Sequence, residues 1–165
     1  MAETLREADS YILFELAGTS YGVPSRDVQH MEMVEHITPV PNASAHVEGV
    51  VFSRGEVVPA INLRLRFGFP KAANTLSSRL IIVKIGPRRV GLIVDAAREF
   101  RKITADTIQP PHESITGLSG SYLAGIAKLG ERVVLLLNMN EVIDKAGSDV
   151  SMPAAQAAPL ATANN

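Results

Sequence analysis

Short apolar stretches separated by turn residues dominate the first part of the chain. Tyr11–Leu16, Val47–Phe52 and Val57–Leu63 are rich in β-branched, aromatic and leucine side chains. Runs of this length and composition favour strands over helices. Tyr21–Val23 follows the turn Ala17-Gly18-Thr19-Ser20 and is predicted to be the return strand of a hairpin.

The same pattern continues to the end of the apolar part of the chain. The predicted later strands are Arg79–Ile85 and Arg89–Val94 about Gly86-Pro87, Ala97–Ile103, and Tyr122–Lys128 and Arg132–Leu137 about Gly130. Ile108–Gly120, which contains Pro110-Pro111, is predicted to be a loop. Many short, evenly spaced strands with little helix are typical of an all-β barrel or sandwich.

Two short helical segments are also predicted. Ser25 is a suitable N-cap, and Val28, Met31 and Val34 are spaced to share one helical face. Asn140–Lys145 is predicted to be a closing helical turn.

The two ends of the chain differ from its middle. Residues 1–9 are polar and are predicted to be a flexible leader, and residues 146–165 are rich in Ala and Pro. Such a composition buries too little apolar surface to fold, so the tail is predicted to be disordered. The folded domain is therefore predicted to span residues 10–145.

Two pairs of segments align without a gap and in the same order. Ile12–Val23 lies over Ile81–Leu92, and Gly49–Leu63 lies over Gly125–Met139. Chance similarity between strand-turn-strand units is the alternative, but two matches in order favour an internal duplication. Each half, at roughly 65 residues, would be marginally stable alone, so the two subdomains are expected to share apolar surface.

Composition narrows the possible functions. The chain of 165 residues is 46% hydrophobic and 20% charged, which allows a substantial core. Its net charge of −1 lacks the basic surplus of nucleic-acid-binding proteins. It has no Cys, no apolar run near the ~18 residues of a membrane span, and a polar start unlike a signal peptide. A cytoplasmic protein without membrane insertion is expected.

Catalytic motifs are scarce. His30–His36 (HMEMVEH) holds the one ionisable cluster, and on a helix Glu32, Glu35 and His36 would share a face. The second His of a typical zinc-binding helix is missing, which favours a solvated face. A metal- or ligand-binding β-barrel remains the alternative. Ser119 lacks the Gly-x-Ser-x-Gly context of a nucleophile, so no enzyme activity, cofactor or metal is predicted.

The turn Arg54-Gly55 joins two predicted strands. Gly55 supplies the positive φ that a tight turn needs, and is therefore a structural residue. The aligned second hairpin has no arginine opposite Arg54, so the fold does not require one there. Arg and aromatic residues such as Phe52 are enriched at protein interfaces. Arg54 is therefore predicted to contact a partner.

The order and spacing of these segments resemble the CheW family of bacterial chemotaxis adaptors. The resemblance runs from about Tyr11 to Ile143. It is carried by Tyr21-Gly22-Val23, Val28-Gln29, Thr38-Pro39-Val40-Pro41, Arg54-Gly55, Val58–Arg64, Gly91–Asp95, Ile103-Thr104 through Pro110, and Tyr122–Ile126.

The resemblance implies a fold and a function. It implies two five-stranded SH3-like barrels sharing a hydrophobic core, and no enzymatic activity. It implies an adaptor that couples the cytoplasmic tips of chemoreceptors (methyl-accepting chemotaxis proteins) to the regulatory domain of a CheA-type histidine kinase. Such an adaptor would lie in the cytoplasm, associated with receptor arrays.

The resemblance also implies site residues. Arg54 matches the arginine of the family's receptor-binding surface, with Val28 and His30 on the nearby segment, Gly49 behind the strand and Phe52 beside the turn. The chain departs from the family at Phe52-Ser53, where Asn-Leu is usual, and at Asn62 and near His30, where acids are usual. These departures leave a second possibility, an interaction module for a non-receptor partner in a divergent chemosensory system.

Overall fold

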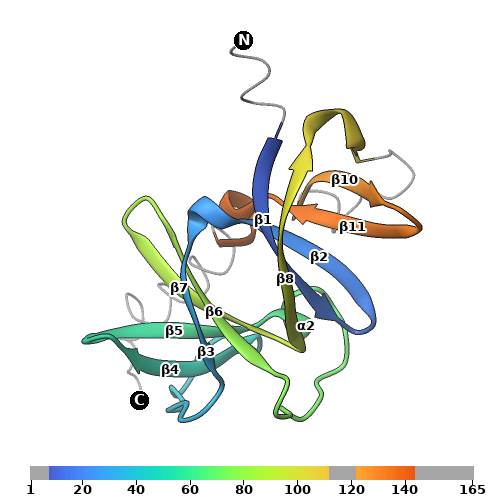
Figure 1. Ribbon diagram of the computed structural model, residues 1–165. Coiled ribbons are helices and arrows are strands. Elements are labelled where there is room, and N and C mark those ends of the chain that lie inside the picture. The colour runs from blue at the N-terminus through green and yellow to red at the C-terminus, as the bar shows by residue number, and fades with distance from the viewer. Residues whose placement is uncertain (1–7, 112–121, 144–165) are drawn as a thin grey trace.

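The strands of the computed structural model, which describes residues 8–111 and 122–143, form two sheets (Figure 1). The six-stranded sheet has the order β8-β1-β2-β11-β10-β9. The five-stranded sheet has the order β3-β6-β7-β5-β4. Their bounds are β1 (Ala8–Leu16), β2 (Thr19–Pro24), β3 (Val28–Met33), β4 (Val47–Ser53), β5 (Glu56–Asn62), β6 (Arg79–Ile85), β7 (Arg88–Val94), β8 (Ala96–Thr104), β9 (Ile108–Gln109), β10 (Leu123–Leu129) and β11 (Arg132–Leu137).

Helix is confined to short segments in the described part of the chain. These are η1 (Ser25–Asp27), α2 (Leu63–Arg66), η2 (Ala105–Thr107) and residues 139–143. The predicted all-β class is confirmed, and so is the predicted closing helical turn as far as residue 143, while residues 144 and 145 lie outside the described residues. β1 begins at Ala8, before the predicted domain start at residue 10. The rest of the predicted leader and the predicted tail lie outside the described residues, as does Ser119.

The two sheets repeat one arrangement of strands. β8-β1-β2-β11-β10 in one sheet corresponds in order to β3-β6-β7-β5-β4 in the other. β2 runs parallel to β11 with Gly22 opposite Leu136, and β7 runs parallel to β5 with Gly91 opposite Ala60. The predicted alignment places these two pairs on each other. The internal duplication is therefore visible in the strand register as well as in the sequence.

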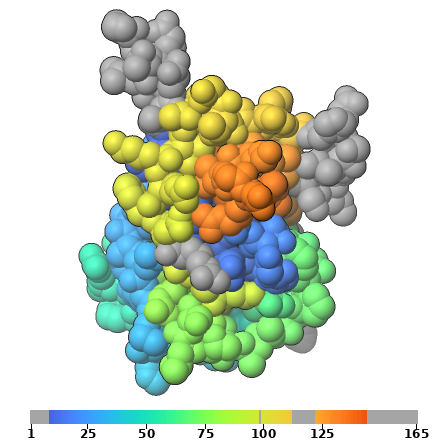
Figure 2. Space-filling model, turned by 45° about the vertical axis from the view of Figure 1, so that its right-hand side comes forward, coloured from blue at the N-terminus to red at the C-terminus, as the bar shows by residue number. Residues whose placement is uncertain are grey.

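The repeats exchange one hairpin each. The β1–β2 hairpin of the first repeat pairs with β8 and β11 of the second, and the β6–β7 hairpin of the second repeat pairs with β3 and β5 of the first. In Figure 1, β1 and β2 lie with β10 and β11, and β6 and β7 lie with β4 and β5. The surface in Figure 2 shows the same mixing, with the early strands in blue next to the late hairpin in orange. Each barrel is thus completed by a hairpin from the other repeat.

Strand periodicity divides the apolar side chains between three cores. In β1, Leu13 packs inside one barrel with Val134 and Leu136, whereas Phe14 points into a cluster shared by both sheets. In the other barrel, Leu80 and Ile82 pack inside, and their neighbours on β6 enter the shared cluster. The predicted sharing of apolar surface is confirmed. Burial of each such side chain stabilises the fold by roughly 1.5–3 kcal/mol.

The helix predicted from Ser25 is wrong beyond Asp27. The N-cap of η1 is Pro24 and not Ser25, and Val28–Met33 forms a strand that pairs with β6. Met31, predicted to share a helical face with Val28, lies on the opposite face of the strand and is 44% exposed. The spacing of three apolar residues alone would allow a helix. The segment forms a strand because the open edge of β6 satisfies its backbone hydrogen bonds. The predicted loop from Ile108 is also wrong at its start, where β9 pairs with β10.

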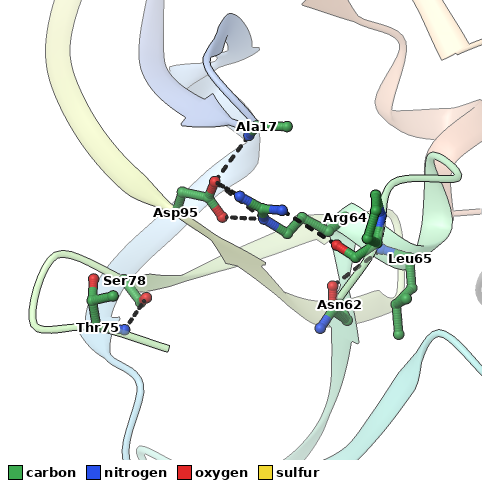
Figure 3. Close-up of polar contacts among 8 residues, drawn as sticks. Ala17, Asn62, Arg64, Leu65, Thr75, Ser78 and Asp95 are labelled. Carbon is green, nitrogen blue, oxygen red and sulfur yellow. Dashed lines mark hydrogen bonds and ion pairs between the residues drawn. The ribbon is translucent and has the colours of Figure 1, made fainter. Parts of the chain in front are cut away.

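An ion pair joins the two barrels at their junction (Figure 3). Arg64, on α2, donates through Nε and Nη2 to the carboxylate of Asp95, at 2.9 and 2.7 Å. Asp95 lies between β7 and β8, and its Oδ2 also accepts from the backbone N of Ala17 in the β1–β2 turn. The hydrogen bonds from Arg64, followed by that from Ala17, hold the pKa of Asp95 below its usual value although burial opposes them.

We predict that the Asp95–Arg64 ion pair contributes stability above the ordinary pKa of an aspartate and loses it in acid. A lowered folded-state pKa means that the unfolded chain takes up the proton first, so the contribution falls as pH drops through the folded pKa. Asp95→Asn should lower the free energy of unfolding by about 1.5–3 kcal/mol at pH 7. Urea denaturation should show this difference shrinking toward pH 3.

Asp106→Asn is the matched control, because Asp106 is exposed on η2. This variant should behave like the parent protein at both pH values. The ion pair would not have the proposed role if the free energy of unfolding of Asp95→Asn stayed below that of the parent protein by the same amount at pH 7 and at pH 3.

Candidate partner-binding surface

Three side chains join the two edge strands of the five-stranded sheet. His30 and Glu32 project from β3, and Ser53 from β4. Ser53 Oγ donates to Glu32 Oε2 at 2.6 Å, and His30 Nε2 lies 2.7 Å from the same oxygen and 3.0 Å from Ser53 Oγ. Since β3 and β4 lie at opposite ends of the strand order, this cluster closes the barrel.

The closing cluster favours the ionised form of Glu32. The hydrogen bond from Ser53 is the main cause of a lowered Glu32 pKa, with His30 and the positive charge of Arg54 acting in the same direction and burial opposing them. Arg54 therefore adjoins a carboxylate that already has hydrogen-bond partners. The predicted helical face of Glu32, Glu35 and His36 is wrong, because β3 is a strand.

Arg54 occupies a backbone conformation that arginine rarely adopts. Its φ is +51° and that of Gly55 is +84°. Both central residues have a positive φ in the type I′ turns that form two-residue hairpin loops. Asn and Gly are preferred at both central positions of such turns. The aligned position in the second hairpin is Gly130, with φ +65°. The predicted positive φ of Gly55 is confirmed, and Arg54, for which no such conformation was predicted, shares it.

An exposed apolar pair lies beside this turn. Phe52 on β4 is 74% exposed, and Val57, directly opposite on β5, is 64% exposed. Strand alternation explains the arrangement, because Val51 and Ser53 on either side of Phe52 are buried. Arg54, Phe52 and Val57 therefore form the solvent-facing tip of one hairpin, which we call the hairpin surface.

Two hollows flank the closing cluster. One, of about 330 Å³, is lined by Gln29, His30, Arg54 and Arg89. The other, of about 290 Å³, lies against the side chains of Glu32 and Phe52. The lining of this second hollow also includes Glu35 and His36. Within the described ranges, no group of three or more His, Cys, Asp or Glu side chains is arranged to hold a metal ion.

Two of the predicted partner-binding residues lie behind the hairpin surface. Val28 is half-buried and packs against the shared core. Gly49 is buried with φ +152°, and a Cβ there would lie 2.1 Å from the carbonyl oxygen of Thr38. Thr38 exchanges two backbone hydrogen bonds with Val50, of 2.8 and 2.9 Å. Gly49 thus permits residue 38 to cover the edge of β4.

The fold and the hairpin surface define a β-barrel module suited to binding other proteins. A family model described as "CheW-like domain" matches residues 10–147, and the chain belongs to this family. Members of the family are non-enzymatic scaffold adaptors of chemotaxis signalling.

Named relatives agree with this membership. "Chemotaxis protein CheW" of Klebsiella aerogenes is 29% identical over 133 residues, covering 81% of this chain and 80% of that protein. The protein of the same name in Bacillus subtilis is 28% identical over 153 residues, covering 93% of this chain and 98% of that protein. The crystal structure of scaffolding protein TtCheW from Thermoanaerobacter tengcongensis matches with a TM-score of 0.78 and 31% identity, over 86% of this chain and 97% of that one. The SH3-like barrels implied by the resemblance are confirmed.

One further finding concerns the membrane. No helix in the described residues is long and apolar enough to cross a bilayer.

We predict that Gly49→Ala destabilises the fold through the contact with Thr38. The new Cβ would collide with backbone atoms, in a φ region that side chains rarely adopt. Such strain costs about 1–3 kcal/mol. Gly55→Ala is the matched control, because it shares a positive φ but its Cβ would meet no atom within 4 Å. Urea denaturation of both variants should rank Gly49→Ala as clearly less stable. Equal stability of the two variants would refute the steric role of Gly49.

Proposed function

We propose that this chain couples chemoreceptor cytoplasmic tips to the regulatory domain of a CheA-type histidine kinase, with the hairpin surface binding the receptor. The observation that carries this proposal is the left-handed conformation of Arg54. A turn selected for stability alone would favour Asn or Gly at this position. An exposed arginine there, beside exposed Phe52 and Val57, fits a residue retained for contact with a partner.

The hairpin surface suits a helical partner. An amphipathic helix binds by laying its apolar side chains on an apolar strip, and Phe52 and Val57 supply one. Arg54 can then donate charge-assisted hydrogen bonds at the edge of the contact. A chemoreceptor tip is a helical hairpin, so its geometry matches this arrangement.

Each residue predicted for receptor binding has a place in this proposal. Arg54 and Phe52 would touch the receptor directly. His30 would hold the turn through Ser53, and Val28 and Gly49 would hold β3 and β4 in position behind it. The kinase would bind elsewhere, which leaves the hairpin surface open to the receptor. A non-receptor helical partner is the alternative occupant, and the binding assay separates the two.

We predict that Arg54→Asn weakens receptor binding without weakening the fold. Asn tolerates the left-handed conformation, so the melting temperature should stay equal or rise slightly. Loss of hydrogen bonds from a charged group, worth roughly 1.5–3 kcal/mol, should weaken binding about 10–100-fold. Titration calorimetry with a purified cytoplasmic fragment of a receptor from the same organism measures the change.

Lys102→Asn is the matched control, because Lys102 is an exposed cation on β8 in the other barrel. It should bind the receptor fragment as the parent protein does. Both variants should still co-purify with the kinase regulatory domain. Parent protein that binds the kinase but no receptor fragment would favour the non-receptor partner, and undiminished receptor binding by Arg54→Asn would remove the assigned role of Arg54.

A further inference from the structure

Two arginines from different elements line the hollow beside the hairpin surface. Arg54 comes from the β4–β5 turn and Arg89 from β7, and Gln29 and His30 complete the lining. The hollow measures about 330 Å³, and Arg54 of the hairpin surface forms part of its lining. Two guanidinium groups at one surface depression attract an anion.

Arg89 retains an unused hydrogen-bond donor. Its Nη1 donates to Glu56 Oε1 at 2.6 Å, but its Nε is buried and has no hydrogen-bond partner in the described part of the chain. Buried donors on a charged group are unfavourable unless an acceptor reaches them. Arg89 therefore has donor capacity beyond its one bond to Glu56, and its place in the lining of the hollow offers its charge to an anion.

The acidic side chains near the hollow already have hydrogen-bond partners. Glu32 already accepts from Ser53 and lies against His30. Glu56 holds Arg89 from the outside, and its side chain is 61% exposed. No close ion pair of Arg54 is found in residues 8–111 and 122–143, and its charge acts on Glu32 from further away. The two arginines that line the hollow thus have one close carboxylate partner in the described residues, Glu56.

We propose that this hollow binds a carboxylate side chain, Asp or Glu, presented by the receptor helix that lies on Phe52 and Val57. This inference rests on the proposed receptor-binding function of the hairpin surface. The planar, forked guanidinium group matches the two oxygens of a carboxylate. Arg89 thus becomes a second specificity residue, and Glu56 competes with the incoming acid for Arg89.

Acetate is the simplest probe of the hollow. Nitrogen–proton correlation spectra of the arginine Nε–H groups, recorded during an acetate titration at constant ionic strength, should show saturable shifts for Arg54 and Arg89. Arg101 and Arg132, which both pair with Glu99 on the other barrel, should not shift. Shifts that chloride reproduces would overturn the proposal, and so would tighter binding of inorganic phosphate than of acetate.

Two variants with opposite expected effects extend the test to the receptor. Arg89→Gln should weaken binding of both acetate and the receptor fragment, the latter about tenfold. Glu56→Gln should strengthen both severalfold, because removing the negative charge at residue 56 weakens its competition for Arg89. Misfolding does not produce a gain in affinity, so this second variant keeps the test informative.

The outcomes separate this inference from the proposed function. If the parent protein binds the receptor fragment but Arg89→Gln and Glu56→Gln bind it equally well, the carboxylate site is refuted and the proposed function stands. If the parent protein binds no receptor fragment, the proposed function fails, and the assignment of the carboxylate to a receptor fails with it.

Discussion

The exchange of the β1–β2 and β6–β7 hairpins between the two repeats is the constraint on which the rest of the structure depends. Neither sheet is complete without a hairpin from the other repeat, and the shared core takes side chains from both. The Asp95–Arg64 ion pair sits where the exchanged β6–β7 hairpin leads into β8, and it also holds the turn of the exchanged β1–β2 hairpin. The hairpin surface depends on this exchange, because β3 pairs with the exchanged strand β6 and carries His30, which contacts Ser53 beside the Arg54 turn.

Much of this fold could be predicted from local pattern. The hairpin strands, the gapless duplication and the sharing of apolar surface follow from strand periodicity and turn residues, which are properties of short segments. Strand β3 was missed because Val28, Met31 and Val34 also fit a helix, and only the open edge of β6, a strand of the other repeat, decides between the two. Arg64 and Asp95 were not paired in advance, because no local signal links residues on separate elements.

The candidate site was also predicted in part and missed in part. Arg54 and Phe52 were predicted from composition and from the family resemblance, and both are exposed. The left-handed turn at Arg54 was missed because arginine gives no sign of that conformation in sequence. Ser53, which departs from the family pattern, contacts His30 and Glu32. The hydrogen-bonded cluster therefore gives this departure a structural role, which the position of Ser53 in the sequence could not show.

Cooperativity of unfolding tests the central claim most directly. Methyl spectra of Val51, inside the barrel of the five-stranded sheet, and Val134, inside the other barrel, follow the two barrels separately during urea denaturation. Strand exchange and a shared core predict coincident midpoints and slopes for the two signals. Loss of the Val51 signal at a urea concentration where Val134 stays native, or the reverse, would show that the barrels are independent and would contradict the account.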